Sequence, residues 1–410
     1  MKVTGLITEY NPFHNGHAYH LQKSKALTGA DYLIAVMSGD FVQRGAPAVI
    51  DKCIRTRMAL EGGADLVLEL PARYALGSAD FFAAGSVSLL ESLGVTDAIA
   101  FGSEEGSIVP FLDIASLLCQ ESRTYQDVLR REISSGLSYP AAREKALAAC
   151  YPQKADDFHR LLSSPNNILG IEYCKSLHRF HSDITPFTVR RRESDYHQKD
   201  LTEQYSSATA LRRHLKEGDI SRLNTQMPPS SWELLNHAAR NRETADTNDY
   251  SLLLKYRLMN ETSSTLPEYQ DVSEELANRI QDQQNRFDTF EGFISLLKTR
   301  QMTYTRIARA LFHILLNIRR FTLSDEVCQV TPYGRILGFR KSASPLLHEI
   351  KKRSQIPLIS KVSGRKSFLT PDACRMLEED IWCANLYESV MAMKNQRPFR
   401  HEASRPLIII

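Results

Sequence analysis

The chain has 410 residues, 42% of them hydrophobic and 24% charged, the composition of an ordinary globular protein with room for two or three domains. This composition excludes a disordered chain, and the lack of any apolar run of about 18 residues gives no reason to expect a membrane protein. The net charge of +3 is too small to indicate a partner. Seven cysteines without a CxxC pair favour a reducing compartment, so we expect a cytoplasmic protein.

The first hundred residues alternate short apolar runs with helical patterns. The runs that we expect to be buried strands are 3–7, 32–37, 65–70 and 98–101. The helical patterns between them cover 16–27, 51–61 and 79–93. Continuous apolar strands separated by helices are typical of a parallel sheet covered on both faces. We therefore expect an α/β fold with a doubly wound parallel sheet (HUP/Rossmann-like), where ligands bind beyond the carboxyl ends of the strands.

The remainder of the chain is mainly helical in pattern. Residues 108–160 lack strand patterning and are expected to form a helical insertion, after which 183–189 returns to the sheet. A helix at 207–217 would close a first domain, residues 1–218, because a Gly- and Pro-containing stretch follows it. Beyond it we expect a mainly α-helical C-terminal domain, residues 230–410, with small strands at 335–339 and 357–359.

Two histidines flank a glycine in the loop after the first expected strand. His14 and His17 stand where the first helix begins, and Gly16 allows a ligand to approach the backbone closely. A helix start offers unpaired N–H groups and the positive end of the helix dipole, and imidazoles there can donate hydrogen bonds to phosphate oxygens. A satisfied turn is the alternative. The position after the first strand favours a phosphate site.

A second anion-binding pattern lies at 206–212. Ser207 and Thr209 stand at the start of an expected helix, and Arg212 follows one turn later. Hydroxyls and an arginine at a helix start suit the β- and γ-phosphates of a nucleotide. The alternative is an ordinary helix cap with an exposed arginine.

These two elements resemble those of the HIGH-motif nucleotidyltransferase superfamily. More narrowly, the chain resembles the tRNA(Met) cytidine acetate ligase family in segments spread over its whole length: 7–21, 38–47, 101–104, 165–173, 191–197, 207–212, 304–307 and 335–339. The resemblance implies a nucleotidyltransferase fold and an enzyme that activates acetate with ATP to acetyl-adenylate. It also implies transfer of the acetyl group to N4 of the wobble cytidine of elongator tRNA(Met).

The resemblance also assigns site residues. Together with the helix-start patterns and the position of Arg44 after the second expected strand, it gives five candidate catalytic side chains: His14, His17, Arg44, Thr209 and Arg212. ATP binding is implied for Ile7, Glu9, Tyr10, Asn11, Pro12, Phe13, His14, Asn15, Gly16, His17, His20, Gly102, Asn166, Asn167, Arg191, Arg192 and Ser207. Three adjacent arginines at 190–192 leave the register there open. No protein-held metal is expected, although Mg²⁺ commonly accompanies nucleotide phosphates.

Polar residues that follow the second expected strand are further candidates. Asp40 would hold a helper residue or Mg²⁺, Arg44 would neutralise the triphosphate or position acetate, and Lys52 and Arg55 would add positive charge. A solvated charged loop is the alternative reading.

The small net charge hides an uneven distribution. Residues 296–370 carry 15 Lys and Arg against three Asp and Glu, whereas 216–295 carry eight against 14. A basic stretch with interleaved aromatic residues suits an RNA backbone, and a solvated face is the alternative. The expected RNA contacts are Arg306, Arg309, Arg319, Arg320, Lys351, Lys352 and Arg353.

Other functions fit the same motifs less well. A small-molecule adenylyltransferase of cofactor biosynthesis shares both phosphate elements but has no need of a large basic second domain. A non-catalytic RNA-binding protein would not need intact His14, His17, Thr209 and Arg212. An aminoacyl-tRNA synthetase is disfavoured because no KMSKS-like loop is visible. No membrane and no stable protein partner are implied.

Overall fold

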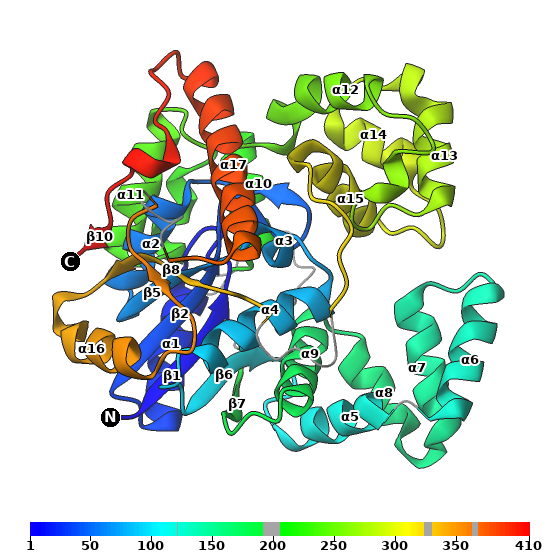
Figure 1. Cartoon of the computed structure of the whole chain (residues 1–410), viewed down its shortest axis with the longest axis horizontal. Helices are drawn as coiled ribbons and strands as arrows, with labels where there is room; N and C mark the ends of the chain where they lie inside the picture. The colour runs from blue at the N-terminus through cyan, green and yellow to red at the C-terminus, as the bar shows by residue number, and fades with distance from the viewer. Residues whose placement is uncertain (121, 192–205, 324–329, 363–367) are drawn as a thin grey trace.

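The computed structural model describes residues 1–120, 122–191, 206–323, 330–362 and 368–410 (Figure 1). Its described part contains an eight-stranded sheet. Seven strands follow the order β10-β8-β5-β2-β1-β6-β7, and the eighth, β9, pairs with β8. Five neighbouring strands pair in parallel with one another: β1 (Val3–Thr8), β2 (Tyr32–Ser38), β5 (Leu66–Leu70), β6 (Ala98–Ser103) and β7 (Thr185–Arg190). The predicted strands of the first hundred residues are therefore confirmed.

Helices cover both faces of this sheet. The central strand β2 shows why, since Leu33, Ala35 and Met37 enter one hydrophobic cluster and Ile34 and Val36 enter another. Successive side chains of a strand point to opposite faces, so an all-apolar strand needs cover on both. One face packs beneath α1 (Asn15–Thr28), α2 (Lys52–Glu61) and α10 (Ala208–Glu217), the other beneath α4 (Ala79–Ser92) and α9 (Pro165–Arg179).

Two helical pieces extend from the sheet. The predicted insertion consists of α5 (Val109–Gln120), α6 (Arg123–Ser134), α7 (Tyr139–Cys150) and α8 (Ala155–Leu162). After α11 (Pro229–Arg240), a bundle with its own hydrophobic cluster is formed by α12 (Ser251–Met259), α13 (Glu274–Gln283), α14 (Phe290–Leu297) and α15 (Tyr304–Leu316). In Figure 1 these pieces stand apart from each other on the right of the sheet. Among the described residues, no helix is both long and apolar enough to cross a membrane.

The last part of the chain returns to the sheet. Strand β8 (Gly334–Phe339) pairs antiparallel with β5, and β9 (Leu358–Ile359) and β10 (Ile408–Ile409) pair with β8. Helices α16 (Ser344–Arg353) and α17 (Pro371–Lys394) connect them. The division into 1–218 and 230–410 stays a prediction, but it did not anticipate this return. A local apolar pattern indicates a strand without naming its partner, and here the partner lies about 270 residues earlier in the chain.

A short hairpin joins the bundle to the sheet. Strands β3 (Phe41–Val42) and β4 (Ala46–Pro47) follow β2, and the ring of Phe41 lies 5.5 Å from that of Phe312 in α15. At the turn, Gly45 has φ 73°, and a Cβ there would lie 2.3 Å from the backbone nitrogen of Arg309. The hairpin is therefore held against α15 at a position where only glycine fits.

Candidate functional site

A cavity of about 340 Å³ lies beyond the carboxyl ends of β1, β6 and β7. The N-terminal ends of α1, α9 and α10 converge on it, as the doubly wound topology predicts. Most of the predicted site residues line it: Ile7, Glu9, Tyr10, His14, Gly16, His17, His20, Arg44, Gly102, Asn166, Arg191, Ser207, Thr209 and Arg212. Arg192 lies outside the described residues.

His14 and His17 form a reciprocal cap at the start of α1. Nδ1 of His14 accepts the backbone N–H of Gly16 at 3.0 Å, and Nδ1 of His17 accepts the N–H of His14 at 3.3 Å. The two rings stack with their centroids 3.8 Å apart. Because both Nδ1 atoms accept hydrogen bonds, a neutral ring carries its proton on Nε2. The cap therefore turns both imidazoles into Nε2–H donors.

The surroundings keep these histidines neutral. Burial, reinforced by the charges of Arg191 and Arg212, lowers the pKa of His14 from 6.5 to about 3. Burial and the neighbouring His14 and Arg191 lower the pKa of His17 well below its usual value. His20, on the next turn, has a pKa lowered to about 4 by burial and Arg191. A neutral imidazole can donate a hydrogen bond to a phosphate oxygen without adding a positive charge to the site.

The second helix start lies across the cavity. Oγ of Ser207 accepts the backbone N–H of Ala210 at 3.1 Å, which caps α10. Arg212 donates to the carbonyl oxygen of Asn11 at 2.8 Å and to Oγ1 of Thr209 at 3.2 Å, so it is tied to the first loop. Burial and nearby Arg44 lower the pKa of Arg212 to about 10, which leaves it charged. Buried cations held close together suit a polyanion.

A third group surrounds Glu104, which the sequence did not single out as a site residue. Nδ2 of Asn166 donates to Glu104 Oε1 at 2.7 Å, and Nε of Arg191 lies 3.7 Å from the same oxygen. Asn167 is behind the wall, where its Oδ1 accepts the N–H of Glu104 at 3.1 Å. A Cβ on Gly102 would meet Arg191 at an ordinary 3.5 Å, so no protein neighbour demands glycine there. The cavity itself leaves room for a ligand against Gly102.

Four predicted residues of the first loop support it from outside the cavity. Oδ1 of Asn11 accepts the N–H of Val49 at 2.7 Å, and the Asn11–Pro12 peptide is cis. The ring of Phe13 packs on that of Tyr10 with centroids 4.9 Å apart, while Asn15 donates to the carbonyl of Thr225 at 2.8 Å. Gln43, which with Asp40 and Arg44 follows the second predicted strand, also lines the cavity, and so does Tyr173, which neither charge nor spacing singles out.

Comparison with known proteins decides which family has this site. The model of the HIGH Nucleotidyl Transferase family matches residues 1–402. The chain is 41% identical over 401 residues to the tRNA(Met) cytidine acetate ligase of Acetivibrio thermocellus, covering 96% of each. It is 37% identical over 425 residues to that of Halothermothrix orenii, covering 100% of this chain and 99% of the relative. The chain belongs to the tRNA(Met) cytidine acetate ligase family.

Solved structures of this family share the whole fold. Thermotoga maritima TmcAL in its apo form superposes with a TM-score of 0.94 at 29% identity, covering 100% of both chains. The same protein bound with alpha-thio ATP gives a TM-score of 0.90 at 30% identity, covering 100% of this chain and 99% of that one. These likenesses confirm the predicted family and the predicted mostly parallel sheet with flanking helices.

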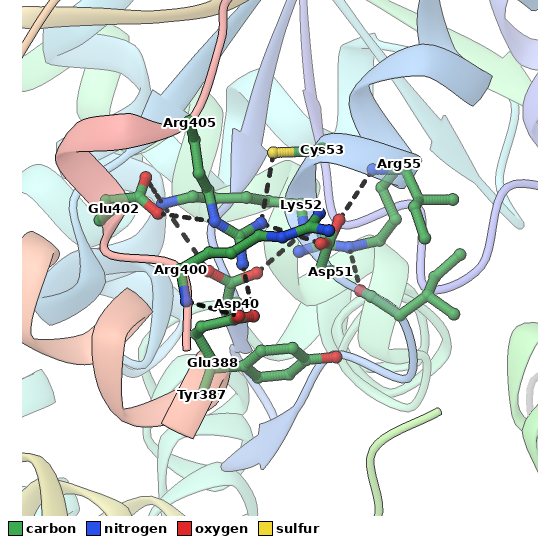
Figure 2. A network of polar contacts seen from close by, with 12 residues as sticks. Asp40, Asp51, Lys52, Cys53, Arg55, Tyr387, Glu388, Arg400, Glu402 and Arg405 are labelled. Atoms are coloured by element: carbon green, nitrogen blue, oxygen red, sulfur yellow. Dashed lines mark hydrogen bonds and ion pairs between the residues drawn. The ribbon is translucent and has the colours of Figure 1, made fainter. Parts of the chain in front are cut away.

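In this member of the family, three polar candidates after β2, namely Asp40, Lys52 and Arg55, are not part of the cavity wall. Figure 2 shows them within a network of polar contacts. Nζ of Lys52 is 2.7 Å from Glu69, 2.8 Å from Glu402 and 3.7 Å from Asp40, all buried. Arg55 donates to the carbonyl oxygens of Glu9, Ser38 and Gly39. The prediction that they act at the site is not supported, because these charges bind each other and the backbone. Arg44 alone of this group lines the cavity.

The network around Lys52 anchors the end of the chain. Arg405 bridges Asp51 at 2.8 Å and Glu388 at 2.9 Å, and Glu402 lies 2.8 Å from Lys52 (Figure 2). The ion pairs of Asp51 and Lys52 join residues that are about 350 positions apart, so the local charge pattern could not predict them. Their effect is to fasten residues 388–405 behind α2.

The predicted RNA contacts of this family member are split between two places. On and after α15, Arg306 is exposed, but Arg309 pairs with Asp271 at 2.9 Å. Arg319 pairs with Glu268 at 2.7 Å, and Arg320 donates to the carbonyl of Val272 at 2.9 Å. The basic stretch is therefore partly neutralised by its acidic neighbour in the sequence.

The other basic group lies at the end of α16. Lys351, Lys352 and Arg353 are exposed, and Glu349 lies 2.9 Å from Lys352 and 3.4 Å from Arg353. Arg353 borders a shallow hollow with Met1 and Asp97, which precede β1 and β6. This is the edge of the sheet opposite to the cavity, and Figure 1 places α16 and α15 on opposite sides of the molecule. The basic residues that the structure describes on α15 and α16 therefore lie in two separate places.

Proposed function

We propose that this chain activates acetate with ATP and transfers the acetyl group to N4 of the wobble cytidine of elongator tRNA(Met). The observation that carries the proposal is the pair of neutral, stacked imidazoles of His14 and His17, which faces Arg212 and the start of α10 across one cavity. Full-length relatives named tRNA(Met) cytidine acetate ligase support it, and they disfavour the small-molecule adenylyltransferase.

In the first step, an oxygen of acetate forms a bond to the α-phosphorus of ATP. The bond from that phosphorus to the oxygen bridging to the β-phosphate breaks, and pyrophosphate leaves with the electron pair. The Nε2–H groups of His14 and His17 donate to the α-phosphate oxygens as charge builds on them. Arg212 and Arg44 hold the departing pyrophosphate by charge. No side chain acts as a nucleophile, so catalysis rests on position and electrostatics.

In the second step, the N4 amine of cytidine attacks the carbonyl carbon of acetyl-adenylate. The bond from that carbon to the AMP oxygen breaks, AMP leaves with the electron pair, and the amine loses a proton. A wobble base already stands in a loop, which lowers the cost of unstacking it.

The described residues around the cavity do not offer a set of metal ligands. Among the described residues no group of His, Cys, Asp and Glu is arranged to hold an ion. Glu9 accepts the N–H of Gln43 at 2.8 Å, and Glu104 is engaged by Asn166. We derive no step through Mg²⁺, whose contribution with a nucleotide is to neutralise phosphate charge.

The proposal extends to the tRNA and to the compartment. Exposed Arg306, Lys351, Lys352 and Arg353 are proposed phosphate contacts. Arg309 and Arg319 contribute where Asp271 and Glu268 yield to phosphate, and Arg320 contributes where it leaves the carbonyl of Val272. A tRNA substrate and unpaired cysteines fit the cytoplasm. No stable protein partner is needed for either step.

The experiment is to incubate the protein with ATP, radiolabelled acetate and separately purified tRNAs. We expect label to enter elongator tRNA(Met) and not initiator tRNA(Met), and His17→Ala to abolish the incorporation. Transfer of AMP to a small phosphorylated acceptor, with no label in any tRNA, would overturn the proposal.

A further inference from the structure

The three polar groups of the cavity differ in charge. The starts of α1 and α10 offer backbone N–H groups, two imidazoles and Arg212, all of which attract phosphate. In the third group, at the end of β6 and the start of α9, Glu104 lies 3.7 Å from Arg191 and offsets its charge. This group therefore suits the uncharged part of ATP, which is the nucleoside, and the cavity has room for it beside Gly102.

Glu104 is held in place at its backbone and at its side chain. Two consecutive asparagines at the start of α9 bind it: Oδ1 of Asn167 accepts its N–H at 3.1 Å, and Nδ2 of Asn166 donates to its Oε1 at 2.7 Å. Asn167 is 2% exposed. The residue before Glu104 ends β6 and is fixed in turn, because Oγ1 of Thr188 donates to Oγ of Ser103 at 2.6 Å. The carboxylate of Glu104 is thus part of the rigid end of the sheet.

The contact with Glu104 dictates which way the amide of Asn166 points. A carboxylate only accepts hydrogen bonds, so the NH2 group of the amide has to face it. Oδ1 of Asn166 lies on the other side of the amide carbon and has no hydrogen-bond partner among the described residues. Asn166 lines the cavity, whereas Glu104 does not. A ligand in the cavity therefore meets an acceptor whose orientation is fixed from behind the wall.

We propose that Glu104 is a positioning residue that holds Oδ1 of Asn166 towards the amine at C6 of adenine and so makes the site select adenine over a base with oxygen at C6. The inference deepens the proposed function and rests on it, because it takes ATP as the nucleotide. A fixed amide is of use against a base edge, where donor and acceptor cannot be exchanged. A ribose hydroxyl both donates and accepts, so it needs no such fixation.

Inosine triphosphate is the matched probe, because it carries oxygen at C6 where ATP carries the amine. That oxygen would face Oδ1 of Asn166, acceptor against acceptor, and leave both unpaired. The cost of an unpaired buried polar group corresponds to about 5- to 150-fold weaker binding. Without Glu104 the amide can turn over and donate its NH2 group to the oxygen. Loss of Glu104 should therefore remove the preference between the two nucleotides.

The test is isothermal titration calorimetry of the full chain with ATP and with inosine triphosphate. The ratio of the two Kd values is compared within each protein, so it does not depend on the fraction that is folded. Wild type should prefer ATP, and Glu104→Leu should bring the two Kd values close together. Glu105→Leu is the control, since this neighbouring half-buried glutamate binds Arg160 instead of Asn166, and it should keep the wild-type ratio.

A double-mutant cycle shows whether Glu104 acts through Asn166. Asn166→Ala should lose the preference for ATP, and Glu104→Leu added to it should leave the ratio unchanged. Glu104→Asp, which withdraws the carboxylate by one carbon, replaces Glu104→Leu if that variant does not fold.

Three results would overturn the inference. They are equal binding of the two nucleotides by wild type, an equal weakening of both in Glu104→Leu, and an effect of Glu104→Leu confined to the ratio of ATP to 2′-deoxy-ATP, which would assign Asn166 to the ribose. Calorimetry needs no turnover. A wild type that selects ATP through Glu104 but acetylates no tRNA would therefore overturn the proposed function alone.

Discussion

The ring of His14 stacks on the ring of His17 with 3.8 Å between centroids, and each Nδ1 accepts a backbone N–H of the same turn. Helix capping uses Nδ1 of each ring, and the proposed phosphate binding uses Nε2. The two roles can be separated by substitution.

His14→Asn should keep the fold and lose the activity. Asparagine is a good N-cap, so its side chain replaces Nδ1 of His14 as the acceptor, but it cannot present Nε2–H to phosphate. We expect kcat/KM for acetylation to fall about 10²- to 10³-fold, with an unchanged free energy of unfolding. His14→Ala should lose activity equally and also about 1 kcal/mol of stability in urea unfolding. Wild-type activity in His14→Asn would mean that His14 serves only as the cap of α1.

Buried neutral histidines should make the protein sensitive to mild acid. The pKa values of His20 and His313 are lowered from 6.5 to about 4 by burial. The unfolded chain binds their protons first, so the free energy of unfolding falls as pH drops from about 6.5 towards 4, by up to about 1.4 kcal/mol per pH unit for each histidine. Urea unfolding at several pH values measures this slope.

His313→Asn provides the comparison for that slope. Its ring lies against Asp271 and Arg309 in the bundle and is fully buried, whereas His181 is exposed. The slope should become shallower in His313→Asn and stay unchanged in His181→Asn. Equal slopes in all three proteins would contradict the assignment.

Glu402→Gln should destabilise the fold without touching the nucleotide site. Glu402 is 2% exposed and lies 2.8 Å from Lys52, so the neutral amide leaves a buried cation short of a partner. We expect a loss of about 3 kcal/mol in denaturant unfolding and an unchanged KM for ATP. Glu349→Gln, at an exposed pair on α16, serves as the control and should leave the unfolding curve as it is. A raised KM for ATP in Glu402→Gln would connect the network to the site.

The two basic groups should differ in the salt dependence of tRNA binding. Each phosphate contact removed lowers the slope of log K against log salt by about one. Arg306→Ala should lower it by about one. The triple variant Lys351/Lys352/Arg353→Ala should lower it by about two, because Glu349 already offsets one of these charges. Filter binding of elongator tRNA(Met) from low to high salt measures both, and an unchanged slope in either variant removes that group from the interface.

Sequence alone predicted the features that depend on neighbouring residues. Apolar runs predicted the parallel strands, and the spacing of His14, Gly16 and His17 marked the start of α1, which borders the cavity. Ser207 proved to be the cap of α10 as well as part of the cavity. Periodicity and capping depend on residues a few positions apart, so they can be recognised in the sequence.

Features that depend on distant partners were missed. Lys52 has the charge of a phosphate ligand, but Glu402, 350 residues later, binds it instead. The basic stretch is continuous in sequence, yet the chain passes through β8 between α15 and α16 and carries its two ends apart. Tyr173 gave no signal because an aromatic residue in a helix is normally part of a core, which Tyr173 also is.

The pairing of β5 with β8 has a consequence for synthesis on the ribosome. Chains emerge from their amino-terminal end, so β5 and Lys52 are present long before β8 and Glu402. During that interval β5 is an uncovered sheet edge, Lys52 lacks its later partner Glu402, and Glu69 lacks its later partner Arg335. The nascent protein therefore cannot complete its sheet beyond β5 until most of the chain has been made.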